Sequence, residues 1–130
     1  MRILLVEDDN LTIESIKLCL EIYEPESKLI STDKGLAAIK LLQENPCDAV
    51  IIDLGLPDID GMEVLEKIRR FSRIPALILT ARHNTESINR ARELGADDFI
   101  TKPFNYRILL NQLHTIMDKV KGQGAGEKSI

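Results

Sequence analysis

The stretch RILLVEDDN, residues 2–10, places four consecutive apolar residues directly before three acidic ones. An uninterrupted apolar run at residues 3–6 is typical of a strand that is buried on both faces of a sheet. Carboxylates crowded at the end of such a strand repel one another and lose hydration, so they need a cation or hydrogen-bond donors nearby. This stretch therefore predicts a buried strand and a chemical site at its carboxyl end.

Outward from this stretch, short apolar runs alternate with longer amphipathic segments. The runs predict strands at residues 3–6, 28–31, 49–53, 76–80 and 98–101. The amphipathic segments predict helices at residues 11–23, 34–44, 61–71, 85–94 and 106–120, and Gly95 reads as a helix stop. Five strand-then-helix units with nearly continuous apolar strands are typical of an α/β fold, with a doubly wound parallel sheet covered on both faces.

Composition limits the function classes that the chain can serve. Its 130 residues, 44% hydrophobic and 29% charged, suit one globular domain. The net charge of −4 disfavours direct binding to nucleic acid or to an anionic membrane. No apolar run approaches the ~20 residues of a membrane span and no signal peptide is evident, so we expect a cytoplasmic protein. Cys19 and Cys47 lack framework spacing, which favours reduced thiols over a disulfide.

Chemically reactive side chains follow the predicted strands in turn. Glu7 and Asp8 follow the first strand, Asp53 ends the third, Thr80 ends the fourth and Lys102 follows the fifth. In an open α/β sheet the carboxyl ends of the strands surround the reactive site, so these groups are expected to converge. Several acids, a hydroxyl and an ammonium suit Mg²⁺ and a phosphoryl group. Asp53, at the end of a buried run, is the natural nucleophile.

Four motifs, in order, carry a family resemblance: LLVEDDN, AVIIDLGLPDIDGMEVL, ALILTAR and ADDFITKPF. With them, residues 1–120 resemble the receiver domain of bacterial two-component response regulators. The resemblance implies a flavodoxin-like receiver fold, five helices around a five-stranded sheet of order 2-1-3-4-5. The glycine-rich residues 121–130 are interpreted as a flexible tail or the start of a linker to an absent output domain.

The resemblance also implies a phosphoacceptor site that depends on Mg²⁺. Asp53 would accept a phosphoryl group from the phosphohistidine of a sensor histidine kinase or phosphotransfer protein. Asp8, Asp53 and the backbone carbonyl of Gly55 would bind Mg²⁺ directly, and Glu7 would act through water. Such a receiver is a signalling module that promotes only its own phosphorylation and dephosphorylation, and is not otherwise an enzyme.

Other residues take switch roles by the same resemblance. Lys102 would pair with Asp53 and then with the phosphoryl oxygens, and the Lys102–Pro103 peptide would be cis. Thr80 would bond a phosphoryl oxygen, and Phe99 occupies the aromatic switch position. Phosphorylation would change the surface of residues 85–120, formed by the fourth helix, fifth strand and fifth helix, and thereby control a partner or an output domain, expected to be transcriptional.

The chain departs from the family pattern at two places. Gly55 stands where many relatives carry a larger side chain, which predicts less shielding of an acyl phosphate. Ile88, Ile108 and Gln112 stand where related receivers carry charged residues that pair across a dimer of the fourth and fifth helices. A homodimer through this face therefore lacks part of its usual charge pattern, although an apolar contact through the isoleucines stays open.

The role of Asp9 and the function of the whole chain each have an alternative interpretation. Asp9 is assigned no catalytic role because it or Asn10 suits an N-cap of the first helix. The runner-up function is a small phosphatase or phosphotransferase that forms an aspartyl phosphate. Such enzymes usually carry a second Asp two residues after the nucleophile, where this chain has Gly55. A pseudo-receiver that binds partners without phosphorylation is disfavoured because the acids, Thr80 and Lys102 are all present.

Overall fold

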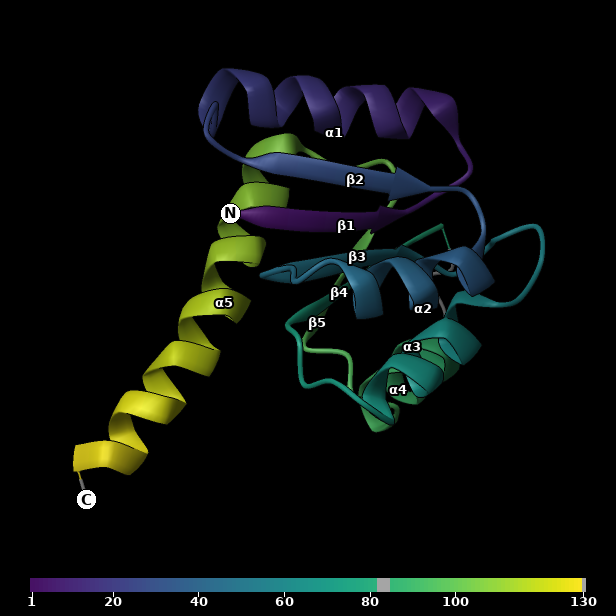
Figure 1. Ribbon diagram of the computed structural model, residues 1–130. Helices are drawn as coiled ribbons and strands as arrows, with labels where there is room; N and C mark the ends of the chain where they lie inside the picture. Colours follow the sequence, from purple (N-terminus) through teal and green to yellow (C-terminus); the bar gives the residue numbers. More distant parts are fainter. Residues whose placement is uncertain (82–84, 130) are drawn as a thin grey trace.

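The computed structural model describes residues 1–81 and 85–129, with side chains through Lys119. The strands of the described chain are β1 (Arg2–Val6), β2 (Lys28–Thr32), β3 (Ala49–Asp53), β4 (Ala76–Thr80) and β5 (Asp98–Thr101). The helices are α1 (Asn10–Tyr23), α2 (Gly35–Glu44), α3 (Gly61–Arg69), α4 (Thr85–Glu93) and α5 (Tyr106–Ser129). The strands form a parallel sheet of order β2-β1-β3-β4-β5 (Figure 1), which confirms the predicted fold.

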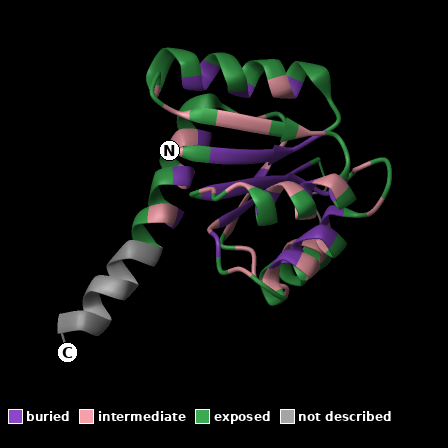
Figure 2. Cartoon of the chain, in the orientation of Figure 1, coloured by how far each residue is buried: buried purple, intermediate pink, exposed green. Residues whose placement is uncertain are grey.

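Alternation along the strands builds two cores, one on each face of the sheet. In β1, Ile3 and Leu5 point to one face, and Leu4 and Val6 to the other. The first core includes Ile16 and Leu20 of α1 and Leu109, Leu113 and Ile116 of α5. The second includes Ala38 and Leu42 of α2, Val64, Leu65 and Ile68 of α3, and Ala91 of α4. Because both faces are covered, the inner strands are buried along nearly their whole length (Figure 2).

Two helix ends differ from the predictions by two residues or more. α3 ends at Arg69 rather than residue 71, because the N–H groups of Phe71 and Ser72 both turn back to the carbonyl of Ile68. α5 continues to Ser129, beyond the predicted end at residue 120, while Ile130 lies outside the described residues. The role of residues 121–130 as a tail or linker stays a prediction. The predicted stop at Gly95 is confirmed, since its φ of 103° closes α4 in the left-handed region.

One helix face also differs. The spacing of Leu36, Ile39 and Leu42 predicts a common buried stripe on α2, yet Leu36 is 56% exposed. The helix packs inward through Ala38 and Leu42, with Ile39 against the same core. At its start, a Cβ on Gly35 would lie 2.5 Å from Val64 Cγ2, so a larger residue would not fit there. No helix within residues 1–81 and 85–129 combines the length and the apolar character needed to cross a membrane.

Candidate functional site

The carboxyl ends of β1, β3, β4 and β5 bring the predicted site residues to one edge of the sheet. Glu7 and Asp8 follow β1, and Asp53 is the last residue of β3. One carboxylate oxygen from each of these three acids lies within 4.8 Å of the others. Thr80 ends β4 and pairs in register with Thr101, the residue before Lys102. The sheet therefore gathers acids, hydroxyl and ammonium as the sequence predicts.

Glu7 is the most enclosed of the acids and is fully buried. Its N–H donates to the Thr32 carbonyl at 3.0 Å, which continues the β1–β2 pairing beyond the strand. Its Oε2 accepts the N–H groups of Asp8 (3.0 Å) and Asp9 (3.3 Å). Burial, reinforced by the neighbouring Asp53 carboxylate, raises the pKa of Glu7 to about 7 despite the nearby Lys102 ammonium. A buried acid of this kind is suited to a site that also holds cations.

Lys102 supplies the positive charge of the pocket. Its Nζ lies 2.5 Å from Glu7 Oε1 and 3.5 Å from Asp53 Oδ2, and its side chain is mostly buried. Burial alone would lower the pKa of Lys102, but the hydrogen bond to Glu7 and the charge of Asp53 outweigh it and raise the pKa. Its backbone N–H donates to the Thr80 carbonyl at 2.7 Å, and the Lys102–Pro103 peptide is cis. Two carboxylates therefore share one ammonium.

The loop after β3 is folded tightly against the phosphoacceptor candidate. The Gly55 N–H donates to Asp53 Oδ1 at 3.3 Å, and the Gly61 N–H donates to the Leu54 carbonyl at 3.0 Å. A Cβ on Gly61 would overlap the Asp53 carbonyl oxygen, so only glycine fits where α3 begins. A Cβ on Gly55 would meet nothing within 4 Å, so this position opens to solvent beside Asp53.

The same loop is tied to a second helix by Asp58, a contact that the sequence analysis missed. The Asp58 carboxylate accepts the N–H groups of Gly35 (2.8 Å) and Leu36 (3.0 Å), the first two residues of α2. Lys34, at the N-cap position of α2, makes no side-chain cap of its own. These backbone hydrogen bonds, that of Leu36 foremost, lower the pKa of Asp58. Because donor and acceptor are more than twenty residues apart, no local pattern signals the pairing.

Asp9 caps α1, as the alternative in the sequence analysis held. Its Oδ1 accepts the Leu11 N–H at 3.3 Å and its Oδ2 accepts the Thr12 hydroxyl at 2.6 Å. The Thr12 hydrogen bond is the main cause of the lowered pKa of Asp9. Asp9 therefore belongs to the helix, whereas Asp8 is free to face the pocket with Glu7 and Asp53.

Thr80 and Phe99 lie on adjoining strands and border a common cavity. Thr80 is 3% exposed, and the half-buried Phe99 ring packs against the core beneath α2, α3 and α4. A cavity of about 10 Å³ is lined by Leu54, Ile78, Thr80, Ser87, Ile88, Ala91 and Phe99. Thr80 and the aromatic ring therefore line the same small space.

The candidate interface residues lie in different environments. Ile108 is 52% exposed, whereas Ile88 is half-buried and lines the cavity beside Thr80. The Gln112 amide donates to Asp98 Oδ2 at 2.8 Å within the same chain. Only Ile108 of the three is therefore fully presented to a second subunit, and dimerisation through this face stays a prediction.

The donor set fits a hard divalent cation. Carboxylate and backbone carbonyl oxygens are the ligands that Mg²⁺ prefers, and it commonly uses one or two carboxylates and keeps several waters. Asp8 is exposed and Asp53 is buried, and their carboxylate oxygens lie with that of Glu7 within 4.8 Å of one another. A cation there would offset the repulsion among acids that one ammonium cannot fully neutralise.

Comparisons with known proteins agree with this geometry. Residues 3–114 match the family described as the response regulator receiver domain. The chain is 37% identical over 123 residues to the cell cycle response regulator CtrA of Brucella ovis, covering 94% of this chain and 52% of CtrA. The CheY-like receiver domain protein from Methanospirillum hungatei JF-1 has a TM-score of 0.85 at 25% identity, covering 94% of this chain and 97% of that one.

A third similar structure is the Mn(2+)-bound form of response regulator Rcp1, with a TM-score of 0.75 at 31% identity, covering 88% of this chain and 90% of that one. The chain spans about half the length of the curated relatives it matches. The family match includes every residue of the site, from Glu7 through Lys102. This chain therefore belongs to the receiver domains of two-component response regulators.

Proposed function

We propose that this receiver is a magnesium-dependent phosphoacceptor switch in which Asp53 takes a phosphoryl group from the phosphohistidine of a sensor histidine kinase or phosphotransfer protein. One observation supports it above all. The carboxylates of Glu7, Asp8 and Asp53 lie within 4.8 Å of one another, and the Lys102 ammonium contacts two of them. Such a pocket has the charges that phosphoryl transfer to an acid requires.

Each residue of the acidic pocket has its own role in phosphoryl transfer. Asp8, Asp53 and the Gly55 carbonyl would hold Mg²⁺, with Glu7 acting through water, and the ion would neutralise charge on the phosphoryl oxygens. A carboxylate oxygen of Asp53 forms the new P–O bond while the donor's P–N bond breaks and its electron pair returns to the imidazole. Lys102 offsets the added negative charge, because its ammonium is already within 3.5 Å of Asp53.

Thr80 and Phe99 would convert phosphorylation into a change of surface. A phosphoryl group adds roughly −1.5 to −2 charges and new acceptor oxygens beside the Thr80 hydroxyl. When Thr80 turns toward them, the cavity that it shares with Phe99 enlarges, and the ring can turn inward. The faces of α4, β5 and α5 would then present a different surface to a partner or output domain.

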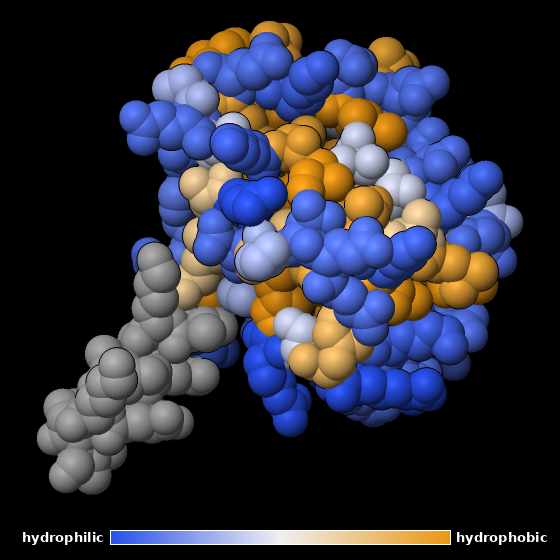
Figure 3. Space-filling view, in the orientation of Figure 1, coloured by the Kyte–Doolittle hydropathy of each residue, from blue (hydrophilic) through white to orange (hydrophobic). Residues whose placement is uncertain are grey.

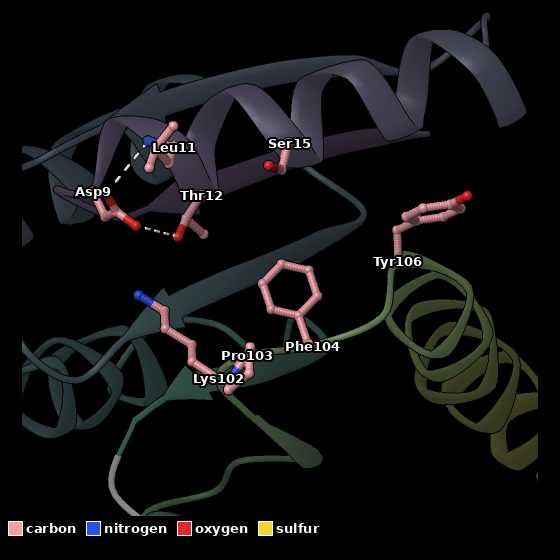
Figure 4. Close-up of a pocket in the computed structure, with 8 residues that line it drawn as sticks. All are labelled: Asp9, Leu11, Thr12, Ser15, Lys102, Pro103, Phe104 and Tyr106. Carbon is pink, nitrogen blue, oxygen red and sulfur yellow. Dashed lines mark hydrogen bonds between the residues drawn. The ribbon is translucent and has the colours of Figure 1, made fainter.

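The phosphodonor would dock beside α1. A hollow of about 460 Å³ opens next to Lys102, between the start of α1 and the loop into α5 (Figure 4). Beyond it, Leu11 (79% exposed), Leu18 (55%) and Ile22 (59%) are exposed along α1. Figure 3 shows hydrophobic patches at the top of the molecule, where α1 lies. The spacing of the three residues, by seven and four, keeps them on one side of the helix as an exposed stripe, the pattern that packs against another helix.

The output is proposed to be transcriptional. CtrA, named as a cell cycle response regulator, is about twice as long as the portion that this chain matches. We therefore infer that an output domain receives the signal, either in the remainder of a longer protein or in a separate partner.

Phosphorylation with a small acyl phosphate tests the proposal without requiring the kinase. The wild-type protein should gain one phosphoryl group in Mg²⁺ and none in excess EDTA. Asp8→Asn should lose most of the Mg²⁺-dependent reaction, because it removes a charged ligand. Asp9→Asn is the matched control, since asparagine preserves the helix cap and should react like the wild type. Equal phosphorylation with and without Mg²⁺ would refute the magnesium-dependent site.

A further inference from the structure

Arg92 lies on the ring of Phe99, a contact that the phosphoacceptor site does not explain. The guanidinium carbon of Arg92, near the end of α4, is 5.1 Å from the Phe99 ring centroid on β5. Arginine over an aromatic face is an attractive arrangement within about 6 Å of the centroid. Arg92 is itself exposed, whereas the ring beneath it is half-buried. The guanidinium therefore covers the outward face of the switch ring.

Phe99 also borders the space into which its ring would move. The small cavity between Thr80 and Phe99 lies beneath α4 and is also lined by Ile88 and Ala91. At 5.1 Å the contact is already near the limit of its range, so an inward shift of about 1 Å would end it. The attraction thus exists in the present ring position and is lost when the ring turns inward.

The end of α4 is held in place, so the backbone of Arg92 does not shift with the ring. Gly95 closes the helix with a φ of 103°. The Arg69 guanidinium donates twice to the Gly95 carbonyl, at 3.0 and 2.9 Å, and pairs with Asp97 at 3.2 Å. Arg69 is largely buried, so α3 anchors both the end of α4 and the approach to β5.

We infer that Arg92 is a positioning residue that holds the Phe99 ring in the position in which the guanidinium covers it. Arg92 thereby sets the level of phosphorylation at which the receiver switches. This inference rests on the proposed phosphorylation switch. A contact made in only one of two states shifts their equilibrium toward that state by its full strength. An exposed cation–π contact is worth about a two- to fivefold change in that equilibrium.

Titration with beryllofluoride, a phosphoryl mimic, in the presence of Mg²⁺ tests the inference. Arg92→Gln removes the cation while preserving helix propensity, and should tighten apparent beryllofluoride binding about two- to fivefold. Arg92→Lys retains a cation and should recover part of the wild-type value. Arg90→Gln is the matched control, because Arg90 is on the same helix, 58% exposed and 3.9 Å from Glu93. It should bind like the wild type.

The same Arg92 substitution in a variant that lacks the Phe99 ring separates the ring contact from a general effect of charge. In Phe99→Leu, which has no aromatic face, Arg92→Gln should add nothing. An equal gain in that background, or wild-type affinity in Arg92→Gln, would overturn the inference. If the wild type itself ignores beryllofluoride, the proposed function has failed, and NMR of the Phe99 ring in the ligand-free protein still decides the contact. Arg92→Gln should move that ring signal, and an unmoved signal refutes the contact.

Discussion

The Lys102 ammonium lies closer to Glu7 than to Asp53, at 2.5 Å against 3.5 Å. The resemblance implies pairing with Asp53, and the structure adds a tighter partner that is fully buried. Lys102 therefore neutralises Glu7, the acid that has no access to water. Its ammonium is also only 3.5 Å from Asp53, the candidate phosphoacceptor. Negative charge added at Asp53 would attract the ammonium toward that side chain.

The buried position of Glu7 predicts a pH dependence of stability in the magnesium-free protein. Its pKa rises from an ordinary 4.5 to about 7, so the folded state holds this proton more tightly than the unfolded chain. The resulting stabilisation is complete below the unfolded value of 4.5 and is lost as pH rises to about 7. We expect the free energy of unfolding, measured by urea titration in EDTA, to fall by about 1–3 kcal/mol between pH 5 and pH 8.

Glu7→Gln provides the control for this slope. The amide cannot ionise, yet its carbonyl can still accept the N–H of Asp8. The lowered pKa values of Asp9 and Asp58 affect stability only in more acidic solution, because both lie below the ordinary value of 3.8. The variant should therefore lose the wild-type slope above pH 5. Identical slopes in the two proteins would contradict the assignment to Glu7.

The contact of Asp58 with the start of α2 predicts a second effect on stability. Asp58→Ala should lower the urea midpoint of unfolding, because the N–H groups of Gly35 and Leu36 lose their acceptor. Asp58→Asn retains an acceptor oxygen and should restore most of the loss. The lowered pKa of Asp58 means that the wild-type advantage over Asp58→Ala is present above its ordinary pKa and disappears as pH falls through the folded value. A pH-independent difference would show that the carboxylate charge is not involved.

These contacts mark where sequence reasoning reaches its limit. The runs at residues 49–53 and 76–80 predict their strands without error, because burial on both faces leaves an unbroken apolar signal. Asp58 gives no such signal, since its partners are brought close only by the packing of α2 on α3. Leu36 misled the prediction for the same reason: helical spacing identifies a stripe, but Gly35 and its close contact with Val64 decide which face turns inward.

The absence of a side chain at Gly55 predicts that the phosphorylated form of the protein is short-lived. Since a Cβ there would meet no neighbouring atom within 4 Å, the backbone at Gly55 leaves room for a side chain to begin beside Asp53. The side chain added in Gly55→Met should shield an acyl phosphate from water and slow its hydrolysis severalfold. Decay of the phosphorylated protein after removal of the donor, followed by intact mass, measures the rate.

Gly55→Ala distinguishes shielding from backbone stiffening. Alanine restricts the chain as methionine does but covers less space, so it should change the decay rate less. A Met variant that decays at the wild-type rate would rule out shielding at this position.

The exposed stripe on α1 predicts a partner-specific defect. Replacing Leu18 and Ile22 by alanine should slow phosphotransfer from a cognate histidine kinase about tenfold, because apolar anchors at an interface often contribute 1 kcal/mol or more each. Phosphorylation by a small acyl phosphate should not change, since neither residue lines the acidic pocket. Leu36→Ala removes an equally exposed leucine from α2 and serves as the control. Equal slowing with both donors would place the defect in the site rather than in docking.

The sequence predicts which residues form the site better than it predicts how their side chains are arranged there. The order of acids, hydroxyl and lysine at successive strand ends predicts that Glu7, Asp53, Thr80 and Lys102 converge. It does not predict which acid the ammonium approaches, because that depends on how deeply each carboxylate is buried. The Arg92 contact with Phe99 is likewise invisible in the sequence, since it needs the exact end of α4 to be known.

The location of the phosphoryl label tests the central claim most directly. The protein is incubated with Mg²⁺ and a small acyl phosphate, and peptide mass spectrometry maps the modified residue in the wild type and in Asp53→Asn. We predict one label on Asp53 in the wild type and none at that position in the variant, whose fold should be retained. A label on another residue of the wild type, or equal labelling of both proteins, would contradict the account.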